Sequence, residues 1–124
     1  MSILRLAWND GSFIREGIYE AFIDQVYVDK AVRVGNNLCD QVVVIYKVAV
    51  GQGVRSIRER YFLPYYPSSR FAAVLNSLYG YLPEQLDTSD LLDCECFIRI
   101  CHKPLPSGKT WCYVDEVLPI AEPQ

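Results

Sequence analysis

The stretch QVVVIYKVAVGQGVRSIRERYFL, residues 41–63, decides the class of fold. Its first part is long and rich in β-branched side chains, which favour an extended strand. Gly-Gln-Gly at 51–53 interrupts this run, and a second strand-like run follows at 54–63. Two strands joined by so short a glycine-rich link form a hairpin. Pro64 and Pro67 end the second run, so the sequence predicts a β-hairpin in the middle of the chain.

Segments on both sides of this hairpin predict three further strands and one helix. Residues 18–28 alternate apolar and polar side chains, as a half-buried strand does. Between a capping serine at 68 or 69 and Gly80, apolar residues recur at helical spacing. Residues 94–103 and 110–118 then predict a second hairpin, because the segment between them contains the turn formers Pro-Leu-Pro-Ser-Gly.

This order of elements is the plan of an all-β fold. We expect a five-stranded, OB-like Greek-key barrel with one α-helix between the third and fourth strands. An unrelated α+β sandwich with the same order of elements is the alternative. The chain has 124 residues, so we expect a single domain, 1–124, that is large enough to bury a core.

Composition excludes several classes of protein. The chain is 51% hydrophobic and 22% charged, which excludes a disordered protein. The longest apolar run, Val42 to Tyr46, is too short to cross a bilayer, and the start lacks the pattern of a signal peptide. The odd number of five cysteines fits reduced thiols better than a disulfide framework, so we expect free Cys94 and Cys96. These features predict a cytoplasmic protein in a bacterium or a phage-infected cell, without a membrane partner.

Catalytic and metal-binding motifs are weak. His102 is the only histidine, and its neighbour Cys101 points to the opposite face of a strand, so the two make a poor catalytic pair. Cys94 and Cys96 lie closer together in sequence than the first two ligands of a typical zinc site. We therefore expect a protein that is not an enzyme and that holds neither a metal nor a cofactor.

Charge is distributed in stripes along the chain. The net charge is −3, yet residues 42–80 carry five basic residues against Glu59 alone. Residues 81–96 carry five acids and no base, and residues 97–113 carry three bases and no acid. A local positive field attracts phosphates even on an acidic protein. The alternative is that these stripes only keep the surface soluble.

The end of the second hairpin has the composition of a base-stacking surface. In a strand, Lys109, Trp111 and Tyr113 share one face, and Cys112 and Val114 share the other. Exposed aromatic rings beside lysine stack on unpaired bases. The alternative is that Trp111 belongs to the core.

Basic and aromatic residues of the first hairpin and the following loop extend this hypothesis, with Arg58 and Arg60 on one strand face beside Lys47. The same residue types suit a protein–protein interface, such as that of an inhibitor or an assembly subunit, which is the rival interpretation. The candidate nucleic-acid-binding residues are Lys47, Arg58, Arg60, Tyr61, Tyr65, Tyr66, Arg70, Lys103, Lys109, Trp111 and Tyr113.

Two motifs resemble a known family. Gly17–Ile23 has the pattern G-x-Y-E-A-x-I, and Ile100–Val114 has the pattern I-C-H-K-P-x-x-x-G-K-x-W-x-Y-V, with Pro119 after the last strand. In these motifs the chain resembles the phage-encoded OB-fold single-stranded DNA-binding proteins. The resemblance covers Gly17 to Pro119 and implies a viral protein of replication or recombination that coats single-stranded DNA with low sequence specificity. The chain lacks the long acidic C-terminal tail of bacterial single-strand binders, so recruitment of partners through such a tail is not implied.

We also expect a homo-oligomer. An open barrel leaves strand edges to cover, and Val42 to Val50 is apolar on both faces of its predicted strand.

Overall fold

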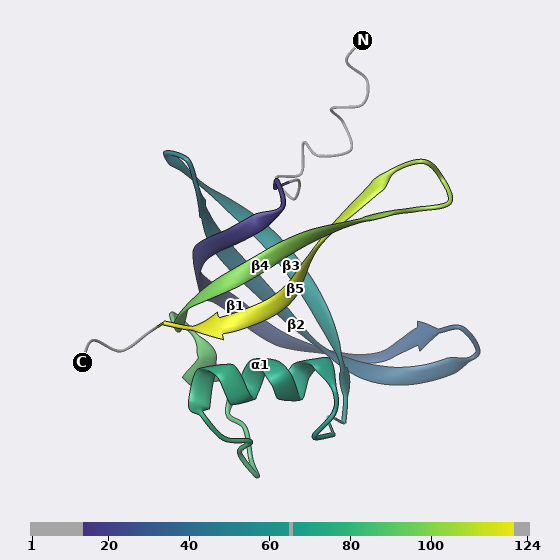
Figure 1. Ribbon diagram of the computed structural model, residues 1–124. Coiled ribbons are helices and arrows are strands. Elements are labelled where there is room, and N and C mark those ends of the chain that lie inside the picture. Colours follow the sequence, from purple (N-terminus) through teal and green to yellow (C-terminus); the bar gives the residue numbers. More distant parts are fainter. Residues whose placement is uncertain (1–13, 65, 121–124) are drawn as a thin grey trace.

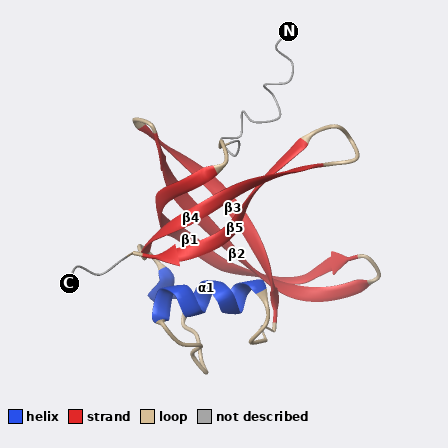
Figure 2. Cartoon of the chain, viewed as in Figure 1, coloured by secondary structure: helices blue, strands red, loops and turns tan. Residues whose placement is uncertain are grey.

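A single antiparallel sheet of five strands makes up most of the molecule. The computed structural model describes residues 14–64 and 66–120. The strands follow the order β3-β2-β1-β4-β5, and a helix connects β3 to β4 (Figure 1). Figure 2 shows that strands make up far more of the molecule than helix, which confirms the predicted all-β class. The elements are β1 (Gly17–Val34), β2 (Asn37–Val50), β3 (Gly53–Leu63), α1 (Arg70–Tyr79), a 3₁₀ turn (Thr88–Leu91), β4 (Glu95–Pro104) and β5 (Thr110–Pro119).

Both predicted hairpins are confirmed. Val50 of β2 pairs with Gly53 of β3 across the Gly51–Gln52 turn, where Gly51 takes a φ of +58°. The first strand is longer than expected, because β1 continues past Val28 to Val34 in pairing with β2. This extension forms a two-stranded arm that projects from the sheet (Figure 1).

The core lies between the inner face of the sheet and α1. Inward-facing side chains of β1, β2 and β4 are fully buried, as at Ile23, Tyr46 and Ile98. Ser69 caps the helix, as predicted, because its Oγ accepts a hydrogen bond from Ala72 N at 3.2 Å. The helix buries Phe71, Ala72, Val74 and Leu75 and packs against β5 and β3.

The stretch from Val42 to Val50 is not the exposed apolar surface that we expected for self-association. Val43, on the outward-facing side of β2, has 0% exposure, and Ile45 is half-buried. Other side chains of this single chain therefore cover most of both faces of this stretch, although Ala49 is exposed. The predicted homo-oligomer is based on this stretch and on free strand edges. Only the edges of the sheet, β3 and β5, still support it.

The barrel does not close. β3 and β5 are the two edges of the sheet, and no ladder joins them in the described part of the chain. The Glu59 side chain spans this gap instead, because its Oε2 accepts a hydrogen bond from Val114 N at 2.9 Å. A bulge lies beside this contact in β5, between Val114 and Glu116, which pair with Ile100 and Arg99 of β4. The gap between β3 and β5, which we call the seam, is therefore bridged by side chains.

Cys94 and Cys96 are both free thiols, as the sequence predicts. Cys96 is fully buried beside Ile98, and burial raises the pKa of its thiol to about 12. Cys94 is half-buried, and the structure pairs neither cysteine in a disulfide. Within residues 14–64 and 66–120, no helix has the length and hydropathy needed to span a membrane.

Candidate nucleic-acid interface

A hollow of about 260 Å³ opens beside the seam. It lies between β3, the start of α1 and the β4–β5 hairpin, and its lining is Glu59, Arg70, Lys103, Trp111 and Tyr113. Four of these five are candidate residues from the sequence, and they come from three different elements. The fold thus brings together candidate residues that are far apart in sequence, since Arg70 and Tyr113 lie 43 positions apart.

Pairing between β4 and β5 determines which side chains face this hollow. Lys103 lies opposite Trp111, and Cys101 lies opposite Tyr113, so these four share one face of the hairpin. Trp111 is 52% exposed, and Val114 on the other face is buried. The predicted outward orientation of Trp111 is therefore confirmed, and the core alternative is wrong.

Lys109 lies just before β5, in the turn of this hairpin. Leu105 N donates to Lys109 O at 2.8 Å, which closes the turn, and Gly108 takes a φ of +88°. Glycine is favoured at such a positive φ because it has no Cβ. Figure 1 shows that this hairpin extends well beyond the rest of the sheet. Lys109 is exposed on the projecting end.

The opposite face of the hairpin is held by residues before β1. His102 Nε2 lies 2.6 Å from Ile14 O, and Cys112 Sγ donates to the same oxygen at 3.5 Å. Glu16 Oε2 accepts from the backbone N of His102 at 2.8 Å. These contacts attach the chain ahead of β1 to the hairpin. In the described ranges, no three His, Cys, Asp or Glu side chains converge as metal ligands.

Arg70 and Glu59 form the base of the hollow. Arg70 Nη2 donates to Glu59 Oε1 at 3.0 Å and to Val114 O at 3.1 Å. The guanidinium carbon also lies 5.1 Å from the ring centroid of Tyr61, within the range of a cation–π contact. About half of the Arg70 side chain stays exposed to solvent.

Glu59 is the residue of the site that sequence reasoning missed. Its side chain is almost fully buried, and burial raises the pKa of its carboxyl, although the Val114 N–H and Arg70 act in the opposite direction. A signal for it exists in the sequence, since it is the lone acid between residues 42 and 80. The signal does not identify its partners, because Arg70 and Val114 lie 11 and 55 positions away.

Tyr61 requires a correction. Only 3% of the residue is exposed, and its hydroxyl lies 2.9 Å from the hydroxyl of Tyr46 in the core. Its ring packs against Phe71, with the centroids 5.3 Å apart. The alternation of β3 turns Tyr61 inward, opposite Arg60, so its ring is not available to a base.

The two tyrosines that follow have different outcomes. Tyr66 is exposed, and its carbonyl accepts from Ser69 Oγ at 2.8 Å, in the turn that leads into α1. It is not part of the lining of the hollow. Tyr65 lies outside the described residues.

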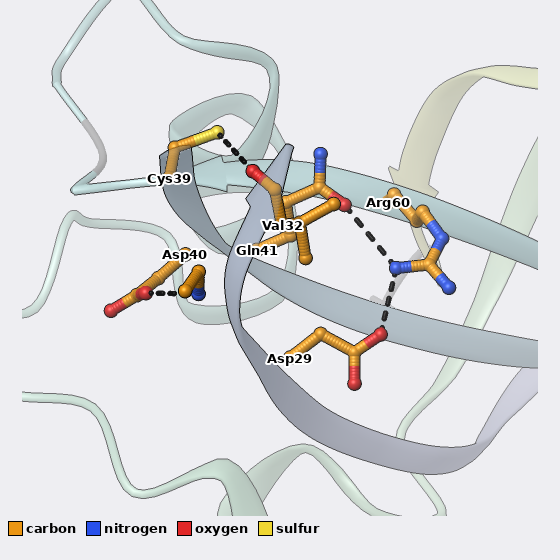
Figure 3. Close-up of polar contacts among 7 residues, drawn as sticks. Asp29, Val32, Cys39, Asp40, Gln41 and Arg60 are labelled. Carbon is orange, nitrogen blue, oxygen red and sulfur yellow. Dashed lines mark hydrogen bonds and ion pairs between the residues drawn. The ribbon is translucent and has the colours of Figure 1, made fainter. Parts of the chain in front are cut away.

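Lys47, Arg58 and Arg60 form a separate group on the outer face of the β2–β3 hairpin. Lys47 Nζ donates to Ser56 Oγ at 2.9 Å. Arg60 Nη1 donates to Asp29 Oδ2 at 2.8 Å and to Gln41 Oε1 at 3.2 Å (Figure 3). None of the three belongs to the lining of the hollow. The predicted basic patch exists, but internal partners already hold two of its three cations.

No family model matches the sequence, and no curated protein and no solved structure matches the chain. The function is therefore inferred from the hollow and its surroundings.

Proposed function

We propose that the protein binds single-stranded DNA, without catalysis and with little preference for sequence. The hollow beside the seam is the contact surface for bases and phosphates. The observation that carries this proposal is the exposed Trp111 ring, with Lys103 directly opposite on the neighbouring strand and Arg70 in the same hollow.

Stacking is the attractive force that this arrangement offers. Every base has a π-face, so an exposed indole holds any base, and each stacked base contributes about 1–3 kcal/mol. Tyr113 lies two residues along the same face and is half-buried, which extends the aromatic surface from solvent toward the seam. Such a surface favours unpaired bases, because bases in a duplex are already stacked on each other.

Cations near the rings supply the second force. Within the described residues, neither Lys103 nor Lys109 makes a side-chain ion pair. Both are exposed, so their charges are available to phosphates. In OB-type barrels the loop between the fourth and fifth strands is one of the segments that contact oligonucleotides. The position of this hairpin therefore supports the same proposal.

The resemblance to phage-encoded single-strand binders supports a more specific role. It suggests coating of single strands during phage replication or recombination, in the cytoplasm of an infected bacterium. Self-association belongs to this proposal as well, and it rests on the free edges β3 and β5. A single monomeric mass by light scattering, at protein concentrations of about tens of micromolar, would contradict it.

A fluorescence titration tests the proposed function. The chain has two tryptophans, so the Trp8→Phe background leaves Trp111 as the only indole. Oligo-dT is expected to quench this fluorescence, and the logarithm of the binding constant is expected to fall linearly with the logarithm of salt concentration. The absence of quenching at low salt, with the variant folded, would reject the proposal and favour a protein–protein interface around Trp111.

A further inference from the structure

Glu59 is an unusual residue for a surface that binds phosphates. It is the only buried carboxylate among residues 14–64 and 66–120. It lies in the lining of the hollow, beside the Arg70 guanidinium that a phosphate would approach. A buried acid at such a place lowers the local positive potential, so its presence needs a reason.

Part of the reason is structural. Oε2 accepts from Val114 N, and Oε1 accepts from Arg70 Nη2, which in turn donates to Val114 O. These three contacts satisfy both backbone groups of Val114 at the free edge of β5. An amide at position 59 also offers an acceptor oxygen for Val114 N, so this need alone does not require a negative charge.

We infer that Glu59 acts as an internal counter-charge, which competes with the phosphates of a bound strand for Arg70 and thereby sets the affinity of the hollow. This inference rests on the proposed function and adds a specificity-determining residue to it. The Glu59 carboxylate contacts the guanidinium at 3.0 Å, and 54% of the Arg70 side chain stays exposed to solvent. A phosphate bound at the exposed part of Arg70 gains from Arg70 and is repelled by Glu59, because all three lie within a few ångströms of each other.

Few other charges lie near this pair. The cation Lys103 of β4 lines the same hollow. Asp115 and Glu116 of β5 line an adjacent hollow with Arg70, and Glu116 is paired with Arg99. The facing groups of β2, β3 and β5 are the tyrosines Tyr46, Tyr61 and Tyr113, all with pKa values raised above the ordinary value, so they are neutral at physiological pH. Protonation of Glu59 therefore changes the balance of charge at Arg70 more directly than titration of any of these tyrosines.

The decisive comparison uses two neutralised carboxylates. Glu59→Gln removes the counter-charge of Arg70, and the matched control Asp29→Asn removes that of Arg60 on the β2–β3 hairpin, where the ion pair measures 2.8 Å. Both changes alter the net charge equally. Glu59→Gln is expected to tighten oligo-dT binding about three- to tenfold at low salt, and Asp29→Asn is expected to leave it nearly unchanged.

The outcomes separate the two proposals. If neither the wild-type protein nor the variants bind oligo-dT, the proposed function fails. If all of them bind and a folded Glu59→Gln variant binds no tighter than wild type, the counter-charge inference fails and the function stands. An equal gain in both variants also overturns the inference, because it indicates a general effect of net charge.

A second measurement needs no variant at position 59. Binding of a phosphate at Arg70 makes protonation of Glu59 more favourable, so the wild-type protein is expected to take up protons when it binds oligo-dT. Calorimetry in buffers of different ionisation enthalpy measures this uptake at about pH 5, near the ordinary pKa of a glutamate. Binding at this pH without proton uptake would contradict the inference, even if the Glu59→Gln variant fails to fold.

Discussion

The two hairpins that the sequence marks as basic differ in what their cations contact. In the β2–β3 hairpin, Lys47 donates to Ser56. Arg60 of β3 reaches across β2 to pair with Asp29 of β1 (Figure 3). In the β4–β5 hairpin, neither Lys103 nor Lys109 has a side-chain ion pair within the described residues, and Trp111, which lies opposite Lys103, is exposed. Position in the sheet accounts for the difference. Val43, the β2 partner of Arg60, also pairs with Tyr27 of β1, so β1 lies within reach of Arg60, whereas the end of the β4–β5 hairpin projects from the sheet.

This difference shows that a count of basic residues overstates the charge available to a ligand. The sheet brings oppositely charged side chains of different strands within hydrogen-bonding distance, as it brings Asp29 of β1 to Arg60 of β3. A projecting hairpin lacks such neighbours on one side, so its charges and rings remain free. Apart from Glu59 at the seam, the comparison predicts that changes in β2–β3 act mainly on stability and changes in β4–β5 mainly on binding.

The largest effect is expected at Tyr61, on the inner face of β3. Tyr61→Ala removes a buried ring that packs on Phe71, and we expect a loss of about 3–5 kcal/mol in the free energy of unfolding. Tyr61→Phe keeps the ring and loses only the contact with the Tyr46 hydroxyl, which should cost about 1 kcal/mol. Denaturation in urea measures both. An unchanged stability in Tyr61→Ala would show that the ring is not part of the core.

The next effect is expected at Trp111. Trp111→Ala should weaken oligo-dT binding by about 1–3 kcal/mol, because it removes one stacking partner. Its melting temperature should stay near that of the wild type, since half of the side chain is already exposed. Anisotropy of a labelled oligonucleotide measures the binding, and thermal melting serves as the control. A large loss of stability would contradict the exposed position of the ring.

A smaller effect separates the cations of the two hairpins. Lys103→Ala should reduce the slope of log affinity against log salt by about one unit, because one phosphate contact is lost. Arg60→Ala should change this slope much less, because Asp29 and Gln41 already hold the guanidinium. Titrations at several salt concentrations give both slopes. If Arg60→Ala lowers the slope as much as Lys103→Ala, the β2–β3 hairpin also contacts the strand.

The smallest effect is a pH dependence at the seam. Burial raises the pKa of Glu59 above its ordinary value of 4.5, so the folded protein holds this proton more tightly than the unfolded chain does. The stability that this group contributes is complete below about pH 4.5 and is lost as the pH rises through the raised pKa. The melting temperature of Glu59→Gln, which does not titrate, should therefore rise relative to wild type over that range. If the difference in melting temperature between Glu59→Gln and wild type stays constant across this pH range, the pKa of Glu59 is not raised.

Local patterns were enough to predict much of the fold. The β-branched run before Gly51 predicts a hairpin, and the serine before the helix predicts a cap. Both depend only on residues a few positions away, and both predictions are confirmed. The outward orientation of Trp111 was one of two interpretations, because period-two alternation defines the faces of a strand and not which face is buried. Tyr61 was assigned to the binding surface on its aromatic character, although its own alternation with Arg60 already placed the two on opposite faces.

The sequence by itself determined the strands, the hairpins, the helix cap and the faces of each strand, because these depend on contacts between near neighbours in the chain. Only the tertiary structure decided which face is covered, that Arg60 is paired with Asp29, and that Glu59 bridges β3 to Val114 at the open seam. These contacts join residues 31 and 55 positions apart. Their partners depend on how the whole sheet twists and where α1 lies against it, and no local pattern records that arrangement.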